Sequence, residues 1–265
     1  MPGFLGPCIG GYVDKFEQSL QYTSAVAKRL GVSGEIHRND FIYKFVLDHP
    51  CFPTIEGAVS YYFENGRQST LMLSELLEKL AYDLKGPLTM LEFASGYGCL
   101  TRHLHVVLPG VRSTACDIHQ EAVDFISNIL RQPAILSDSV PEKLDSKRKY
   151  DVVFALSFFS HMPRSTWGRW ISALYNAVAK GGVLLFTTHG NVSRKYFGNP
   201  DIPKDGFWFK TVSEQVDLDT AEYGSTLVTK EFVERELDSR IGQPITLYRE
   251  AHWWSHQDLY AVVKR

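Results

Sequence analysis

The chain has 265 residues and a net charge of −2 at pH 7, with 44% apolar and 22% charged residues. These values are typical of a globular protein with a sizeable core, and they exclude the strongly basic surface that nucleic-acid backbones require. None of the four cysteines forms a C-x-x-C pair, which argues against a zinc knuckle or a disulfide framework and favours a reducing compartment, the cytoplasm; they are Cys8, Cys51, Cys99 and Cys116.

Residues 1–85 are expected to form an N-terminal helical cap. The start, MPGFLGPCIGGYVDKF, has no basic segment followed by an apolar run, so we expect no signal peptide. Apolar residues at helical spacing predict one helix that ends at Gly31 and another that ends at Gly86. The proline-containing segment LDHPCFPTIEG between them is expected to be a loop.

From residue 86 onward, short apolar segments alternate with helical patterns. This alternation predicts an α/β fold with a doubly wound, Rossmann-like parallel sheet in one domain over residues 86–265. No apolar run approaches the roughly 20 residues that span a bilayer, so no membrane partner is expected. The predicted strands cover residues 88–94, 112–117, 134–138, 150–159 and 183–189, and the helices between them cover residues 100–110, 119–131 and 164–182.

The regular alternation is expected to stop after residue 189. Residues 190–225 are polar and rich in glycine and proline, which predicts a lid-like insertion. A helix over residues 229–242 and strands over 244–250 and 258–265 follow. The connection between these two strands is too short for a crossover helix, so the last strands should be antiparallel.

A glycine-rich loop, LEFASGYGCL, connects the first predicted strand to a helix, where backbone N–H groups can hold a ligand. Gly96 and Gly98 fit the dinucleotide pattern G-x-G-x-x-G, but Thr101 stands at its third glycine position. Asp117, about 20 residues later, ends the second strand and could accept hydrogen bonds from both hydroxyls of a ribose. Glu92 lies just before the loop, where its charge disfavours a pyrophosphate and favours a ligand with an ammonium group.

Five segments together resemble the motifs of the class I S-adenosylmethionine-dependent methyltransferases. In chain order they are LEFASGYGCLTRHL, TACDIHQEAVDF, ILSDS, YDVVFALSFFSHMP and GGVLLFTTHG. The resemblance implies that Asp117 binds the ribose and that Asp138 caps the adenine amine. It departs from the pattern at Ala94, where the family has its first glycine, and it names no substrate.

The resemblance implies S-adenosylmethionine as the cofactor and a set of contact residues from the loop and the strand ends. The alternatives for these residues are a turn without a ligand at the two glycines, a helix N-cap at Asp117, a hydrogen-bonded buried acid at Glu92, and simple packing. Arg67 of the cap is expected near the methionine carboxylate, unless it is solvated. The other expected contacts are Glu92, Ala94, Ser95, Gly96, Tyr97, Gly98, Asp117, Ile118, Ser137, Asp138, Ser139, Leu156, Ser157 and Phe158.

His161 and His189 follow the fourth and fifth strands, and either could be a catalytic base. Aromatic residues near a cationic methyl donor would exclude water, although packing of the insertion explains them as well. His252 and His256 are four residues apart, but a hairpin is expected there, so no metal site is predicted. The expected substrate contacts are Trp208, Tyr223, His252, Trp253 and His256.

The predicted function is methyl transfer to a small molecule. No N-P-P-Y-like motif follows the fourth strand, which disfavours a nucleobase amine, so a hydroxyl acceptor is preferred and an amine comes second. An NAD-linked oxidoreductase and a cofactor-binding module without turnover are the alternatives. No nucleic-acid partner is expected, and the pattern favours no particular oligomeric state.

Overall fold

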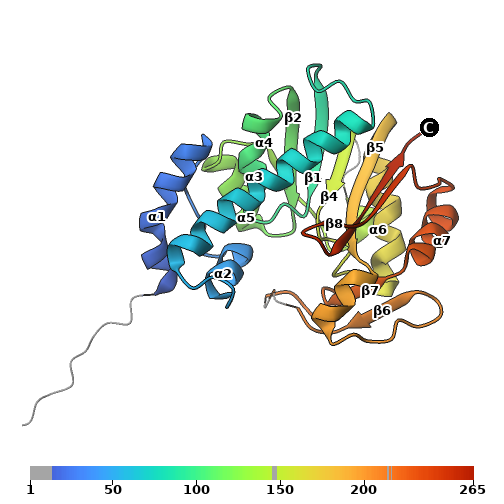
Figure 1. The fold of residues 1–265 in the computed structure, drawn as a ribbon. Coiled ribbons are helices and arrows are strands. Elements are labelled where there is room, and N and C mark those ends of the chain that lie inside the picture. Colours follow the sequence, from blue (N-terminus) through green and yellow to red (C-terminus); the bar gives the residue numbers. More distant parts are fainter. Residues whose placement is uncertain (1–13, 145–147, 214, 216) are drawn as a thin grey trace, which may run out of the picture.

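The computed structural model describes residues 14–144, 148–213, 215 and 217–265. Residues 1–13 of the segment on which the absence of a signal peptide was predicted, with Cys8 among them, lie outside these residues. The described residues form a seven-stranded sheet with helices on both faces and a separate two-stranded sheet (Figure 1). No helix within them is long and apolar enough to cross a membrane.

The large sheet has the strand order β3-β2-β1-β4-β5-β9-β8. Strands β1 to β5 are parallel, β9 pairs antiparallel with β5, and β8 pairs antiparallel with β9. This arrangement confirms the predicted doubly wound sheet with an antiparallel last strand. The strands are β1 Leu88–Phe93, β2 Val111–Asp117, β3 Ala134–Leu136, β4 Tyr150–Ala155, β5 Val178–His189, β8 Leu247–Trp253 and β9 Gln257–Val263.

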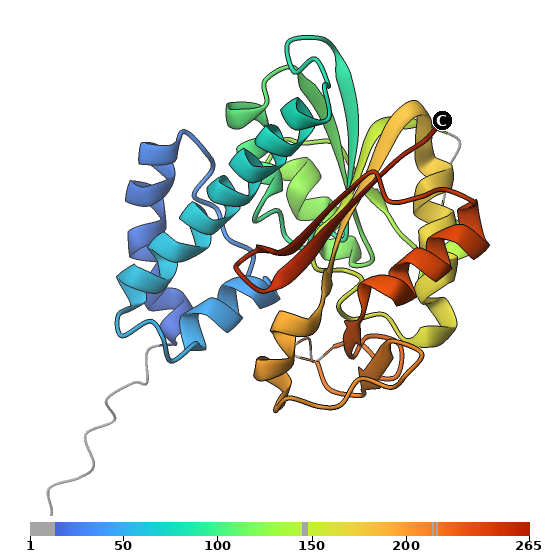
Figure 2. The same ribbon diagram turned by 45° about the vertical axis from the view of Figure 1, so that its right-hand side comes forward.

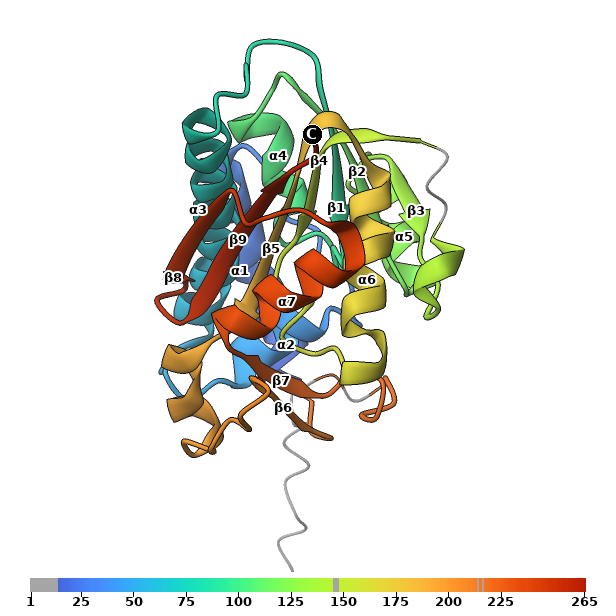
Figure 3. The ribbon, with the colours of Figure 1, turned by 90° about the vertical axis from the view of Figure 1, so that its right-hand side faces the viewer.

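Two hydrophobic clusters cover the two faces of this sheet. Side chains alternate along each strand, so in β1 Met90 joins one cluster while Leu91 and Phe93 join the other. Helices α3 (Ile55–Lys79) and α4 (Thr101–Val107) pack on the Met90 face. Helices α6 (Arg164–Ala177) and α7 (Lys230–Ile241) pack on the opposite face, as the two layers in Figure 3 show.

Strand order reverses between β1 and β4, since β2 and β3 lie on one side of β1 and the later strands lie on the other. In an open α/β sheet, ligands bind in the crevice outside the carboxyl ends of the strands at such a switch point. Helix α5 (Gln120–Asn128) follows β2 and packs beside this edge. The fold therefore directs the search for a site to the ends of β1, β2 and β4.

The N-terminal cap is helical, but its last helix is longer than predicted and is shared with the sheet. Helix α1 (Lys15–Leu30) ends as expected at Gly31, which adopts a left-handed φ of 71°. Helix α3 begins after its N-cap Thr54 and ends near Leu80, well before the predicted Gly86. Its first half packs with α1 and α2 (Phe41–Asp48), and its second half joins the Met90 cluster. The first half of the cap thus has a hydrophobic cluster of its own, whereas the end of α3 packs with the sheet, and the domain boundary after residue 85 stays a prediction.

Arg102 fastens the cap to the glycine-rich loop. Its guanidinium is 1% exposed and donates to the backbone oxygens of Ser33, Glu35 and Gly98, each at 3.0 Å. The same group lies over the rings of Tyr62 and Phe63, which adds cation–π attraction. Because these partners belong to both the cap and the loop, the position of the cap is tied to that of the loop.

The insertion, residues 190–225, contains regular structure that the sequence did not reveal. A 3-10 helix, η2, covers Asn191–Phe197, and β6 (Phe207–Lys210) pairs antiparallel with β7 (Ser225–Val228). Strands of four residues separated by a long connection leave no local signature, because their stability comes from distant pairing. Figure 2 shows these elements beyond the carboxyl edge of the sheet, opposite the N-terminal helices.

Candidate functional site

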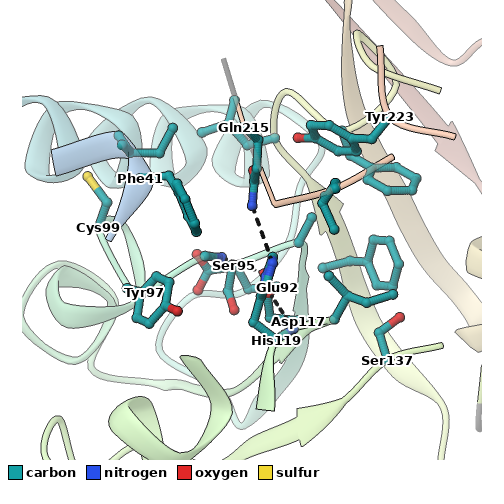
Figure 4. A pocket seen from close by; sticks show the side chains of 18 of the residues that line it. Phe41, Glu92, Ser95, Tyr97, Cys99, Asp117, His119, Ser137, Gln215 and Tyr223 are labelled. Atoms are coloured by element: carbon teal, nitrogen blue, oxygen red, sulfur yellow. Dashed lines mark hydrogen bonds and ion pairs between the residues drawn. The ribbon is translucent and has the colours of Figure 1, made fainter. Parts of the chain in front are cut away.

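A cavity of about 400 Å³ lies at the carboxyl ends of β1, β2 and β4, a size that suits a small-molecule ligand. It is lined by the strand ends, the N-terminal helices, helix α6, the insertion and the turn between β8 and β9. Figure 4 shows Gln215 extending from the insertion toward His119, above Asp117. Among the residues expected to contact the cofactor, the lining contains Glu92, Ala94, Ser95, Gly96, Tyr97, Asp117, Ile118, Ser137, Asp138, Ser139, Leu156 and Phe158.

The two glycines of the loop have different roles. Gly96 has a φ of 55°, and a Cβ there would meet no atom within 4 Å, so its backbone borders open space in the cavity. A Cβ on Gly98 would lie 2.6 Å from Cδ1 of Leu130, which places this glycine against the segment after α5. Gly98 does not line the cavity, and its position against Leu130 gives it a packing role, so its cofactor contact stays a prediction. Ala94 has a φ of 57°, the left-handed conformation that explains the family's glycine.

Asp117 holds the glycine loop in place. It is 5% exposed, and its Oδ2 accepts the backbone N–H of Gly96 at 2.7 Å. Its Oδ1 accepts from the backbone N–H of His119 at 3.0 Å and pairs with Nδ1 of the same residue at 2.8 Å. A carboxylate accepts about four hydrogen bonds. Three are already made, so with these bonds intact Asp117 has capacity for one ribose hydroxyl rather than two.

Glu92 is a buried acid on the cavity wall. Its Oε2 accepts a hydrogen bond from Oγ1 of Thr101 at 2.8 Å. Burial raises its pKa to about 8, and the nearby Asp117 contributes in the same direction. At neutral pH the side chain is therefore mostly a neutral acid. A ligand that brings a positive charge close to Glu92 would favour the ionised carboxylate, and this carboxylate would then attract the charge of the ligand.

His119 lines the cavity, although no role was predicted for it from the sequence. Its Nδ1 contacts Asp117, and its Nε2 contacts Oδ2 of Asp217 in the insertion at 2.9 Å. The hydrogen bond with Asp117 is the main reason that its pKa is raised. The imidazole thus connects the end of β2 to the insertion. Its place two residues after Asp117 was the available signal, but only the fold brings Asp217 to it.

The loop after β4 alternates between the cavity and the interior. Leu156 and Phe158 line the cavity, whereas Ser157 between them does not. The backbone N–H of Ser157 donates to Oγ1 of Thr187, and its hydroxyl accepts from Nε2 of Gln257, both near β5 and β9. These hydrogen bonds direct Ser157 toward the sheet and give it a structural role, so its cofactor contact stays a prediction.

Arg67 is exposed and does not line the cavity. On a helix, consecutive residues point about 100° apart, and the cavity face of α3 carries Asn65, Gly66 and Ser69 instead. The sequence could not fix this helical phase. A Cβ at Gly66 would lie 2.1 Å from the backbone oxygen of Cys99, so only glycine allows α3 to lie this close to the loop. From the cap, the lining also includes Asp40, Phe41 and Ile42.

Neither predicted catalytic histidine lines the cavity. His161 is buried, its Nδ1 bonds the backbone oxygen of Gly224 at 2.8 Å, and its ring stacks on Tyr223 with centroids 4.4 Å apart. His189 is also buried, which lowers its pKa to about 3, and its Nε2 lies 3.2 Å from the amide nitrogen of Gln257. The geometry thus gives His161 a supporting position beneath Tyr223 and leaves His189 behind the cavity wall.

Of the five predicted substrate contacts, only Tyr223 lines the cavity. Trp253 is fully buried, and its Nε1 donates to Oγ of Ser69. His252 lies on strand β8, His256 packs beside His189, and Trp208 packs on Phe197. These four side chains lie outside the cavity lining, and their substrate contacts stay predictions.

Trp254, which the sequence reasoning passed over, lines the cavity in place of its neighbour Trp253. Its backbone is left-handed, with a φ of 50°, at the turn between β8 and β9. The indole Nε1 donates to Oδ1 of Asn65 at 2.7 Å. The turn conformation therefore decides which of two adjacent tryptophans reaches the site.

Comparison with protein families identifies the central part of the chain. Residues 91–184 match the family model of a methyltransferase domain. None of the curated proteins compared with the chain matches it. The matched region contains β1, the glycine-rich loop, Asp117 and the loop after β4. The match confirms the family that the sequence motifs predicted.

Solved structures share the whole fold at low sequence identity. An S-adenosylmethionine-dependent methyltransferase from Clostridium acetobutylicum is 15% identical, with a TM-score of 0.58, over 85% of this chain and 98% of its own. Magnesium protoporphyrin IX methyltransferase from Synechocystis with bound S-adenosylhomocysteine is 15% identical, with a TM-score of 0.53, over 95% and 100%. The 1,6-didemethyltoxoflavin N1-methyltransferase from Burkholderia thailandensis is 14% identical, with a TM-score of 0.52, over 88% and 93%. At this identity the similarity establishes the fold.

Proposed function

The chain carries a methyltransferase domain on the fold of the S-adenosylmethionine-dependent class, and from this premise we propose that it transfers a methyl group to a nucleophilic atom of a small molecule. The observation that carries the proposal is the pair of buried carboxylates, Glu92 and Asp117, on either side of the glycine loop in one cavity. The proposed cofactor contacts and the proposed methyl acceptor rest on the geometry of that cavity.

The lining residues suit S-adenosylmethionine, which supplies an electrophilic methyl group on a sulfonium. Asp117 would accept one ribose hydroxyl while it holds Gly96. Ile118 and Phe158 offer apolar surface for the adenine, and Asp138 would accept from its amine. Glu92 would bind the ammonium group of the methionine portion. In this reaction the protein mainly aligns the two reactants and excludes water.

The same cavity disfavours NAD. A pyrophosphate would bring two negative charges next to the Asp117 carboxylate, and it would offer no positive charge to the buried acid Glu92. No lysine or arginine among the described residues lines the cavity and could neutralise them. Thr101, which replaces the third glycine of the dinucleotide pattern, hydrogen-bonds Glu92 instead. A binding module without turnover has the same cofactor contacts, so only a catalytic assay separates it from the enzyme.

The acceptor is proposed to be a small molecule that presents an oxygen or a nitrogen nucleophile. The sequence preference for a hydroxyl depended on a histidine base. Neither His161 nor His189 lines the cavity, so the preference for a hydroxyl over an amine loses its support.

Titration calorimetry with S-adenosylmethionine, S-adenosylhomocysteine and NADH tests the cofactor assignment. We expect the first two to bind and NADH not to bind. Asp117→Ala should weaken both at least tenfold, since a hydrogen bond to a charged group is worth about 1.5–3 kcal/mol and the loop loses its anchor. Glu250→Gln, an exposed change outside the cavity, is the control. Tight NADH binding, or full affinity in Asp117→Ala, would contradict the assignment.

A further inference from the structure

The residues that line the cavity include many more acids than bases. The chain has 28 basic and 30 acidic residues, so an even mixture of lining charges would be expected by composition. Instead the described lining has six carboxylate residues, one histidine, and no lysine or arginine. The six are Asp40, Glu92, Asp117, Asp138, Asp219 and Glu222.

Four of these carboxylates are already committed. Asp40 caps α2 and accepts from the hydroxyl of Tyr62. Glu92, Asp117 and Asp138 belong to the cofactor contacts proposed above. Asp219 and Glu222 remain, both on the part of the insertion that also brings Leu218 and Tyr223 to the cavity. They are exposed at the open side, where a second reactant would enter.

No basic side chain neutralises this pair from within the described lining. Arg169 is in electrostatic contact with Glu222. That guanidinium is already paired with Glu142, with Nε 2.7 Å from Oε1. Asp219 uses Oδ1 to accept the backbone N–H of Ala221 at 2.9 Å, which fixes the turn and leaves Oδ2 for other donors. The open side of the cavity therefore attracts cations and repels anions.

The lining also offers no suitable base for a hydroxyl acceptor. His119 is held between Asp117 and Asp217, which stabilises its protonated form. Burial keeps the phenol of Tyr97 protonated by raising its pKa. A carboxylate is a weaker base than a neutral imidazole, so Asp219 and Glu222 would remove an alcohol proton less readily than a histidine would. A neutral amine is a far stronger nucleophile than a neutral alcohol, and an ammonium ion forms it by losing a proton to water.

We propose that the methyl acceptor is an amine that carries a positive charge in solution, and that Asp219 and Glu222 bind it beside Leu218 and Tyr223. This inference rests on the proposed methyltransferase function. The ammonium ion first gives a proton to water. The nitrogen lone pair then forms the N–C bond while the C–S bond breaks and its electron pair stays on sulfur. The positive charge moves from sulfur to nitrogen and stays within reach of the same carboxylates.

Binding of benzylammonium, benzyl alcohol and benzoate to the protein saturated with S-adenosylhomocysteine tests the charge preference on one carbon skeleton. We expect benzylammonium to bind at least tenfold more tightly than the other two, with an affinity that falls as salt increases. The double variant Asp219→Asn/Glu222→Gln should lose at least tenfold for benzylammonium. The matched control Asp201→Asn/Glu250→Gln removes two exposed acids outside the cavity and should change nothing.

Absent binding of benzylammonium, tighter binding of benzoate, or an unchanged double variant would overturn the amine assignment. None of these results would affect the cofactor assignment, because S-adenosylhomocysteine binding is measured first and separately. If S-adenosylhomocysteine itself does not bind, the proposed function fails before the amine is tested. A screen of amines and alcohols for methylated product, read by mass, gives the catalytic counterpart: product from alcohols alone would also overturn the inference.

Discussion

The indole Nε1 of Trp254 donates a hydrogen bond to Oδ1 of Asn65 at 2.7 Å, and both side chains line the cavity. Asn65 belongs to α3 in the N-terminal cap, and Trp254 belongs to the turn between the last two strands. The bond therefore connects an N-terminal helix to the last pair of strands at the cavity. The N-terminal helices are therefore part of the site, which a domain cut after residue 85 would have missed.

Trp254→Phe removes this donor while it keeps an aromatic ring in the cavity wall. We expect a loss of about 1 kcal/mol in the free energy of unfolding and a several-fold loss of S-adenosylmethionine affinity, because the N-terminal helices are held less firmly at the cavity. Calorimetry and urea unfolding measure the two effects. Trp253→Phe is the neighbouring comparison, and it should affect stability more than affinity, since Trp253 is fully buried outside the cavity lining. Undiminished S-adenosylmethionine affinity in Trp254→Phe would show that this hydrogen bond to the N-terminal helices does not support cofactor binding.

Glu92 predicts a pH dependence of stability in the absence of ligand. Its pKa in the folded protein is about 8, against a usual value of 4.5. Between these values the folded state binds more protons than the unfolded state, so stability falls as pH rises from about 4.5 to 8. Glu92→Gln should flatten this fall and be the more stable protein at pH 8, by about 1 kcal/mol or more. Urea unfolding at pH 5 and pH 8 checks it, and a parallel pH dependence in the variant would contradict the burial argument.

His119 predicts a second loss of stability as pH rises, at a higher starting pH. Its pKa is raised above 6.5 in the folded protein, so its pairing with Asp117 and Asp217 is fully present below pH 6.5. The contribution is lost as pH rises through the folded pKa, because a neutral imidazole can donate to only one of the two carboxylates. His119→Gln should therefore lower the melting temperature at pH 6 more than at pH 9. The exposed His105 provides a control, and an equal loss at both pH values would show that the ion pairs contribute nothing.

Ala94 predicts a stabilising substitution. Its φ of 57° is a left-handed conformation that costs an L-residue about 1–2 kcal/mol, whereas glycine adopts it freely. After the greater entropy of glycine in the unfolded chain is subtracted, Ala94→Gly should gain up to about 1 kcal/mol. Ala122→Gly, inside α5, should instead cost about 1 kcal/mol. Urea midpoints compare the two, and destabilisation of both would mean that the Cβ of Ala94 contributes packing that outweighs its strain.

The sequence by itself determined the sheet, the glycine loop and the acids around it. The apolar runs of β1 and β4 and the helical periods between strands are local patterns, and they place Gly96 and Asp117 at strand ends whatever the rest of the chain does. Parallel strands have their carboxyl ends at one edge, so these residues had to converge. The family match over residues 91–184 follows the same local signals.

Only the tertiary structure decided which side chains reach the cavity from elsewhere. Asn65 rather than Arg67 faces the site because packing of α3 on the sheet sets the phase of that helix. Trp254 rather than Trp253 does so because a left-handed turn residue reverses the alternation of β8. His161 and His189 are directed away by hydrogen bonds to Gly224 and Gln257, partners more than 60 residues distant along the chain. Such directions depend on contacts between remote segments, whose energies no local pattern contains.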